Sequence, residues 1–217
     1  MKRIVLIMCL LLNLPFVKAQ DSILIKNRTD FLRRWSPLEV DNLFDKHITP
    51  HHYFYQFVPV NEESYKIVWG NDSIRNTSKS IFTEREGVRH SLAWENDDFI
   101  VIHGSDGSDT WHNIILPLKS NANECIVFNP IAKDMPSNII VLEQCGTSDT
   151  LLAVYYLKTQ TVSYIVDPQI KCSSFFIHYC IKSIKFSNNQ LVVEWVTPNY
   201  IDTPNTIIRK EYKLYAR

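Results

Sequence analysis

Two histidines and two aspartates surround a single expected turn, where their side chains could act together. His103 and His112 stand on either side of a segment that contains Asp106 and Asp109. If neighbouring strands carry the two imidazoles, they could hold a divalent ion with a carboxylate or transfer protons. A simpler interpretation is that these are solvent-facing residues of a hairpin. The four residues are therefore named as a candidate recognition surface, with no metal and no catalytic role assigned.

Two further clusters of titratable residues have simple explanations. Three nearby acids could include a glycosidase pair, but such a pair lies across a cleft, and acids in a hairpin turn are usually solvated. Three histidines at the end of an expected helix could share a metal, but Thr49 and Pro50 interrupt the helical spacing that this requires. These residues are Glu95, Asp97, Asp98, His47, His51 and His52.

The chain carries no recognised catalytic motif. It has no G-x-S-x-G elbow, no H-E-x-x-H helix and no reactive-cysteine signature. Only five glycines occur in 217 residues, which argues against glycine-rich phosphate loops. We therefore expect no cofactor, and a noncatalytic role is favoured over an enzyme.

Residues 1–19 have the features of a cleavable signal peptide. Two basic residues precede an apolar run at 4–12, and Val17 and Ala19 stand three and one positions before the expected cut. The run is shorter than the roughly 20 residues that cross a bilayer. With Gln20 after the cut, the signal resembles those of exported Bacteroides-group proteins. We expect a periplasmic or secreted protein without stable membrane insertion.

The charge balance excludes one class of partner. The chain contains 23 acidic and 23 basic side chains, and signal removal takes three of the basic ones away. A phosphate-neutralising surface is not expected from this balance, so nucleic acid is a poor partner. A protein or a glycan remains as the expected partner.

The sequence from His52 onward predicts a mostly antiparallel all-β domain. Short runs of β-branched and aromatic residues alternate there with turn residues, while Ser36 and Pro37 begin the one expected helix, about 37–47. A single domain is expected over 20–217. The expected strands are 53–60, 64–69, 88–95, 98–103, 110–117, 124–129, 138–145, 151–157, 161–167, 173–180, 182–187, 191–196 and 206–215.

A weak internal repeat favours a propeller-like arrangement of hairpins. Trp94 to Val101 resembles Phe186 to Val193, since an aromatic residue, a polar turn and an apolar strand follow in the same order. Similar strand starts occur at 65, 99, 151 and 191, with spacings close to those of propeller blades. A β-sandwich is the alternative architecture.

The segment 99–111, FIVIHGSDGSDTW, is similar to the Asp-box of sialidase-like propellers, Ser-x-Asp-x-Gly-x-Thr-Trp. Asp106 and Trp111 match, whereas Gly104 and Ser108 depart from the pattern. The resemblance covers 104–111 and implies a structural hairpin with the aspartate on turn amides and the tryptophan buried between strands. It implies no chemistry.

Four cysteines remain after signal removal. They allow three disulfide pairings, and the local one is favoured, because each of its pairs closes a short loop. Four free thiols are the open alternative. The favoured pairs are Cys125–Cys145 and Cys172–Cys180.

These observations favour an exported, noncatalytic binding module that presents aromatic and polar loop residues to a protein or a glycan. One specific version is a periplasmic inhibitor or immunity protein directed against a toxin. A glycan hydrolase using carboxylates at one end of a propeller-like fold is a second hypothesis, and a subunit of a surface assembly is a third.

Overall fold

The computed structural model describes residues 44–83, 89–105, 111–144, 150–172, 174–196 and 206–214. These residues form antiparallel sheets, so the expected all-β class is confirmed. Within the described ranges, no helix has the length and apolar character needed to span a membrane.

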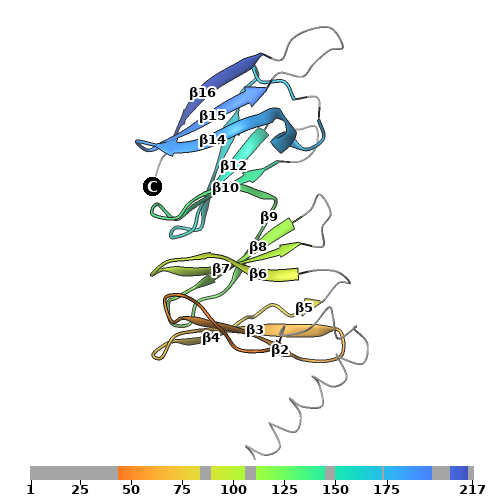
Figure 1. Ribbon diagram of the computed structural model, residues 1–217, viewed down its shortest axis with the longest axis vertical. Helices are drawn as coiled ribbons and strands as arrows, with labels where there is room; N and C mark the ends of the chain where they lie inside the picture. The colour runs from red at the N-terminus through yellow and green to blue at the C-terminus, as the bar shows by residue number, and fades with distance from the viewer. Residues whose placement is uncertain are drawn as a thin grey trace, which may run out of the picture. The chain divides into compact units, whose positions relative to one another are not determined.

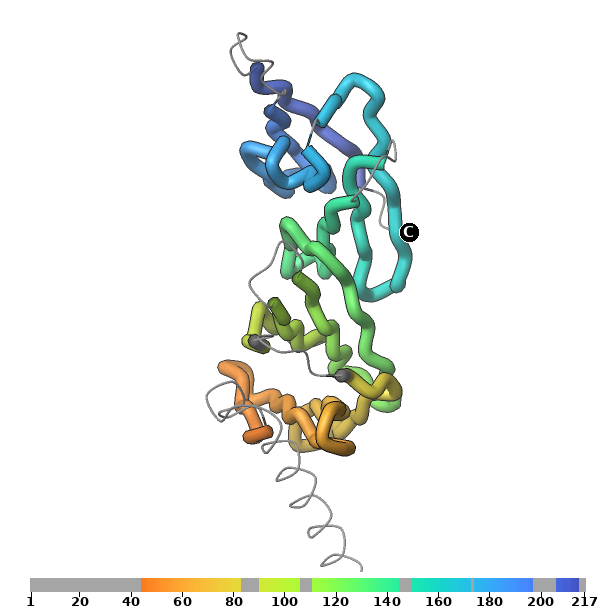
Figure 2. Tube along the Cα trace, turned by 90° about the vertical axis from the view of Figure 1, so that its right-hand side faces the viewer, coloured from red at the N-terminus to blue at the C-terminus, as the bar shows by residue number. Residues whose placement is uncertain are grey.

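The strands are arranged as four successive meanders, which can be followed along the chain in Figures 1 and 2. The first sheet contains β1 (His47–Ile48), β2 (Phe54–Pro59), β3 (Ser64–Gly70), β4 (Arg75–Thr77) and β5 (Phe82–Thr83). The second contains β6 (Arg89–Glu95), β7 (Phe99–Ser105), β8 (Trp111–Pro117) and β9 (Cys125–Phe128). The third contains β10 (Pro130–Asp134), β11 (Ile139–Glu143), β12 (Thr150–Tyr156) and β13 (Thr161–Val166). The fourth contains β14 (Ile181–Ser187), β15 (Gln190–Val196) and β16 (Ile207–Lys213).

The chain divides into two compact units. The first comprises residues 1–109 and 114–125, and the second comprises 110–113 and 126–217. The expectation of one domain over 20–217 stays a prediction.

The core of the first unit lies between its two sheets. Alternate residues of β3 point to one face, so Tyr65, Ile67 and Trp69 pack with Ile100 and Ile102 of β7. These side chains are almost fully buried, and each contributes about 1.5 to 3 kcal/mol through removal of apolar surface from water. The alternating pattern therefore fixes which face of each sheet points inward.

The second unit is built in the same way. Leu152 and Val154 of β12 pack with Leu191, Val193 and Trp195 of β15 in a second buried cluster. This packing joins the third and fourth sheets around one core.

Asparagines make the tight turns. The β14–β15 hairpin has a two-residue loop, because Ser187 pairs with Gln190 across it. Asn188 and Asn189 have positive φ angles of 49° and 59°. A two-residue loop of this kind needs positive φ at both positions, and asparagine tolerates that conformation better than other non-glycine residues.

The four expected repeat starts fall in four different sheets. Residues 65, 99, 151 and 191 lie at or next to the first residues of β3, β7, β12 and β15. Each of these strands is an inner strand of its meander. No closed propeller is seen in the part of the chain that the structure describes.

The short N-terminal helix expected at about 37–47 is not seen among the described residues. Most of the expected range 37–47 lies outside the described residues, and its described end, 44–47, is a turn that leads into β1. His47 pairs with Tyr55, while Phe44 joins the core of the first unit. Strand pairing and burial of Phe44 therefore replace helix at this end of the range.

The expected strand 173–180 is wrong. Its described part forms a loop that ends in η1 (Ile177–Cys180), a short 3-10 helix. A disulfide brings the Cα atoms of Cys172 and Cys180 to 5.8 Å, whereas an extended segment of this length would separate them by about 26 Å. The strands β1, β4, β5 and β10 were not expected from the sequence, because they are very short or rich in polar residues.

Candidate functional site

The four residues expected to form a recognition surface are described only in part. His103 lies on β7 and His112 on β8, which are neighbours in the second sheet, and both side chains are half-buried. Asp106 and Asp109 lie outside the described residues. The ring of His112 lies 6.2 Å from that of Phe128. Across the described ranges, no three histidine, cysteine or acidic side chains form a group that could hold a metal.

The acids near Glu95 hold one segment of the first unit in place. Glu95 accepts a hydrogen bond from the backbone N–H of His51 at 2.9 Å, and only 6% of its side chain is exposed. The hydroxyl of Tyr53 donates to Asp97 at 3.4 Å. These contacts tie residues 51–53 to the β6–β7 turn, which is a structural role for both carboxylates.

The three histidines of the segment 47–52 make separate contacts. His47 stacks on Tyr55 with 4.8 Å between the ring centroids, while the ring of His51 lies against Tyr53. His52 has a positive φ of 64° in an exposed turn. The sequence favours exposed loop histidines over a metal site, which holds for His51 and His52 in their exposed turn, whereas His47 is half-buried in β1.

Trp111 is half-buried, not buried as the Asp-box resemblance implied. Its indole N–H donates to the carbonyl of Pro130 at 2.8 Å, and its ring meets the ring of His178 edge-on at 5.5 Å. Its backbone N–H donates to Asn129. The indole keeps some exposure because one of its neighbours is a partly exposed imidazole. Through its contact with His178, Trp111 belongs to a second cluster of side chains.

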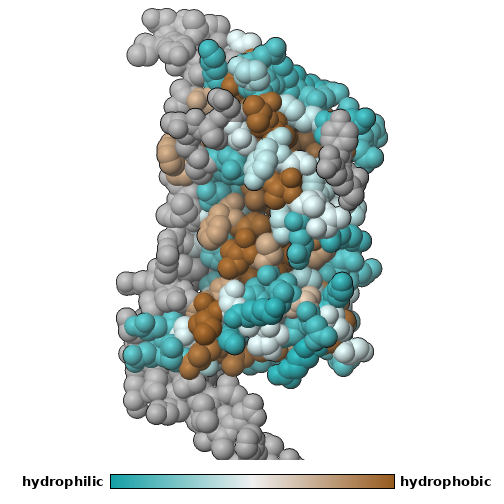
Figure 3. Space-filling view, turned by 180° about the vertical axis from the view of Figure 1, so that it is seen from behind, coloured by the Kyte–Doolittle hydropathy of each residue, from teal (hydrophilic) through white to brown (hydrophobic). Residues whose placement is uncertain are grey.

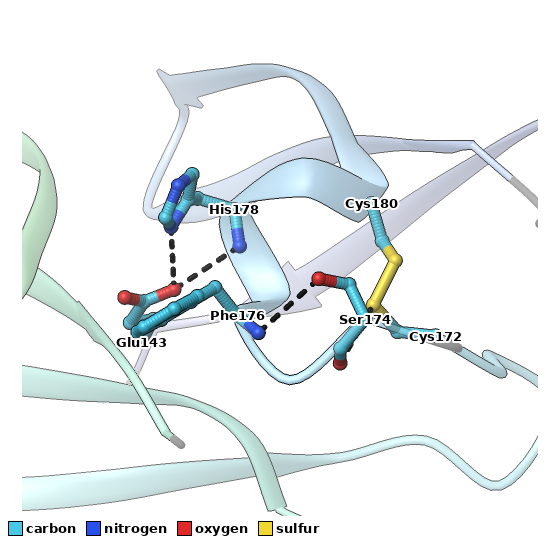
Figure 4. The surroundings of a disulfide bond; sticks show 6 residues. All are labelled: Glu143, Cys172, Ser174, Phe176, His178 and Cys180. Carbon is cyan, nitrogen blue, oxygen red and sulfur yellow. Dashed lines mark hydrogen bonds and ion pairs between the residues drawn. A yellow bond between two sulfur atoms is a disulfide. The ribbon is translucent and has the colours of Figure 1, made fainter. Parts of the chain in front are cut away.

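That cluster surrounds a loop closed by a disulfide, and we name residues 172–180 the aromatic loop. Cys172 and Cys180 are joined, as the favoured local pairing expects. The backbone N–H of Phe176 donates to the hydroxyl of Ser174 inside the loop, as Figure 4 shows. Ser174 is therefore part of the turn. Cys125 is half-buried, and because Cys145 lies outside the described residues, the other pair stays a prediction.

The buried carboxylate of Glu143 holds the aromatic loop in place. Glu143 is the last residue of β11, and its side chain has no exposure to solvent. One of its oxygens, Oε2, accepts from the backbone N–H of His178 at 3.1 Å and contacts Nδ1 of the same residue at 2.8 Å (Figure 4). The other oxygen, Oε1, is buried with no hydrogen-bond partner among the described residues.

The aromatic loop directs large side chains to solvent. Phe175 is 66% exposed and Tyr179 is 61% exposed. Phe175 meets Phe176 edge-on at 5.1 Å, and the ring of His178 lies 4.2 Å from that of Tyr179. A disulfide and a buried acid thus hold several rings in one short segment.

Three of the other exposed hydrophobic residues, Val162, Tyr164 and Val166, alternate along β13, and the rest are distributed over several elements. Figure 3 shows hydrophobic side chains among hydrophilic ones on one face of the molecule. Outside the aromatic loop, the large exposed ones are Ile48, Val60, Ile81, Phe128, Met135, Val162, Tyr164, Val166 and Ile207. The loop differs from them because its exposed rings are tied down by a covalent bond and a buried acid.

The His178–Glu143 pair resembles the acid–base part of a catalytic triad, in which the acid contacts Nδ1 of the histidine. Nδ1 is engaged by Glu143, and the nearby serine of the loop serves its own turn.

The sequence did not single out Glu143, Phe175, His178 or Tyr179. The available signal was the close cysteine pair around the aromatic-rich segment 175–179. The apolar composition of this segment predicts a strand, so the sequence pattern does not indicate the loop.

The chain matches no protein-family model, and no curated protein or solved structure is significantly similar to it.

Proposed function

We propose that this chain is an exported, noncatalytic binding module that recognises a protein partner through the aromatic loop. The observation that carries the proposal is the exposure of Phe175 and Tyr179 on a segment held by the Cys172–Cys180 disulfide and the buried Glu143. Export and a periplasmic or extracellular location are part of the proposal and rest on the signal-like residues 1–19.

Rigid exposed aromatic rings are well suited to protein recognition. Tyrosine and other aromatic residues are enriched among the few residues that dominate binding energy at interfaces. A surface that is ordered before binding avoids the entropy cost of ordering it in the complex. The disulfide and the Glu143–His178 contacts supply that order here. An inhibitor or immunity protein that blocks a toxin is the specific version we favour.

The repeated meanders support a further proposal about how the chain is built. Four consecutive sheets with the same sequential strand order are what repetition of a hairpin unit would produce. We propose that they derive from a propeller-like repeat.

Recognition is tested with two matched variants. Wild-type protein is immobilised and exposed to periplasmic and extracellular extract, a captured protein is identified by mass spectrometry, and its Kd is then measured with purified material. We expect Phe175→Ala with Tyr179→Ala to raise Kd by about a hundredfold, since aromatic hot spots contribute 2 kcal/mol or more. Tyr164→Ala is the control, because Tyr164 is 65% exposed on β13 and lies outside the loop.

Three results would overturn the proposal. One is equal binding by the loop variant and wild type. Another is equal loss with Tyr164→Ala, which would indicate nonspecific adhesion. The third is a response on a glycan array that is strong while no protein partner survives purification. Export is tested separately by intact mass, which should place the mature N-terminus at Gln20.

A further inference from the structure

The second unit contains a cavity that is distinct from the aromatic loop. Its volume is about 450 Å³, within the range of about 300 to 1,000 Å³ that is common for small-molecule sites. The third sheet contributes the end of β10 and residues of β11 and β12, and the fourth contributes the β14–β15 turn. Its principal lining residues are Asp134, Tyr156, Phe186, Asn188, Asn189 and Gln190.

The polar side of the cavity is formed by a rigid turn. Asn188 and Asn189 occupy the two-residue loop with positive φ, and the carbonyl of Asn189 accepts from the backbone N–H of Leu214 at 2.8 Å. Strand pairing of Ser187 with Gln190 fixes the turn at its base. The backbone of the turn is therefore fixed before any ligand arrives, and the side chains of Asn188 and Asn189 are exposed to solvent.

The lining also includes two aromatic residues, Tyr156 and Phe186. Phe186 is half-buried, and Tyr156 is only 7% exposed and belongs to the core of the second unit. The Tyr156 hydroxyl is buried and has no hydrogen-bond partner among the described residues. Because this hydroxyl is closed to solvent, Tyr156 lines the cavity through its other atoms.

The charge of the lining limits the chemistry of the ligand. Among the described residues that line the cavity, Asp134 is the one ionisable acid and no lysine or arginine occurs. An anionic ligand would meet a carboxylate without a compensating cation. Side-chain amides both donate and accept, and a carboxylate accepts from two donors.

We propose that this cavity binds a neutral sugar. A sugar ring has an apolar C–H face that can lie on Phe186, and its hydroxyls both donate and accept, which matches Asn188, Asn189 and Asp134. This inference concerns residues outside the aromatic loop and does not depend on the proposed protein partner.

The test is saturation-transfer NMR on the purified protein with galactose, glucose, mannose and N-acetylglucosamine, and with glucuronic acid as an anionic comparison. We expect at least one neutral sugar to bind and glucuronic acid to bind more weakly. Asn188→Gly with Asn189→Gly removes the amides but tolerates the positive φ, and should raise Kd by about tenfold through lost hydrogen bonds. Gln160→Gly is the matched control, because Gln160 also has positive φ, 55°, but lies in the β12–β13 turn outside the cavity.

Tyr156→Phe and Phe175→Ala complete the test. Both variants should leave sugar binding unchanged, because the Tyr156 hydroxyl is closed to solvent and Phe175 lies outside the cavity. Thermal melting of each variant identifies any that fails to fold. If Tyr156→Phe fails to fold, the glycine variants still decide the test, because their substitutions lie in an exposed turn. No binding of any neutral sugar in the panel, tighter binding of glucuronic acid, or equal effects of the double variant and Gln160→Gly would overturn the proposal.

Discussion

Glu143 and His178 form a partly enclosed polar contact in the second unit. The carboxylate has no solvent exposure and receives both the backbone N–H and the Nδ1 of His178, at 3.1 and 2.8 Å. The first unit contains a related but more open contact. There Glu95 accepts the backbone N–H of His51 at 2.9 Å, while the imidazole stays 3.7 Å away and 59% exposed.

The two histidines should therefore differ in their contribution to stability. His178→Ala leaves a buried carboxylate with one partner fewer, and we expect the free energy of unfolding to fall by about 3 kcal/mol. His51→Ala removes a largely solvated contact and should cost under about 1 kcal/mol. Urea denaturation of both variants beside wild type measures the difference. Equal losses would show that burial of Glu143 is not what makes its contact important.

The disulfide of the aromatic loop should contribute measurably to stability. It closes a short loop, with a sequence separation of 8. Loop-closure entropy predicts that Cys172→Ser with Cys180→Ser lowers the free energy of unfolding by about 2.5 kcal/mol. Urea denaturation of the double variant, and of wild type with and without reductant, tests this. A reduced wild type as stable as the oxidised form would contradict the prediction.

Two tryptophans should respond differently to truncation. Trp69 has no exposure and donates from its indole N–H to the carbonyl of Pro117 at 2.8 Å, so Trp69→Ala should cost about 3 to 5 kcal/mol. Trp111 is half-buried, and Trp111→Ala should cost less, about 1 to 2 kcal/mol. Thermal melting of the two variants gives the comparison. An unchanged midpoint for Trp111→Ala would assign the indole to a recognition surface.

Tyr212 should make stability depend on alkaline pH. Burial, followed by the nearby negative charge of Asp167, raises the pKa of its phenol above the ordinary value of 10.0. Above pH 10 the unfolded chain loses this proton while the folded chain keeps it, so the contribution is complete below pH 10 and declines as pH rises. Tyr212→Phe should make the loss of stability above pH 10 shallower, as urea denaturation between pH 8 and about 11 would show. An unchanged slope would contradict the assignment.

Tyr212→Phe also has an expected effect at neutral pH. The Tyr212 hydroxyl donates to Asp167 at 3.1 Å and accepts from the indole N–H of Trp195 at 3.1 Å. Loss of these bonds should lower the free energy of unfolding by about 1 to 3 kcal/mol. The neutral and alkaline effects are separable because only the second changes with pH.

Local patterns in the sequence determined the class of fold and most strand positions. Alternation in β3 and β15 follows from sheet geometry, which sends successive side chains to opposite faces. Asn188 and Asn189 indicate the β14–β15 hairpin because few other residues tolerate positive φ. The Cys172–Cys180 pair is also local, since its two cysteines are close in the chain.

Only the tertiary structure decided what these elements bring together. Glu143 and His178 are separated by 35 residues, and the cavity combines residues as distant as Asp134 and Asn189. The alternation of apolar and polar residues predicts which face of a strand is buried. It does not predict which loop contacts the end of a given strand, because those contacts depend on how the sheets pack. For the same reason the apolar composition of segment 175–179 predicts a strand. In the structure, the disulfide and the contacts with Glu143 hold this segment in a loop, which exposes two of its rings.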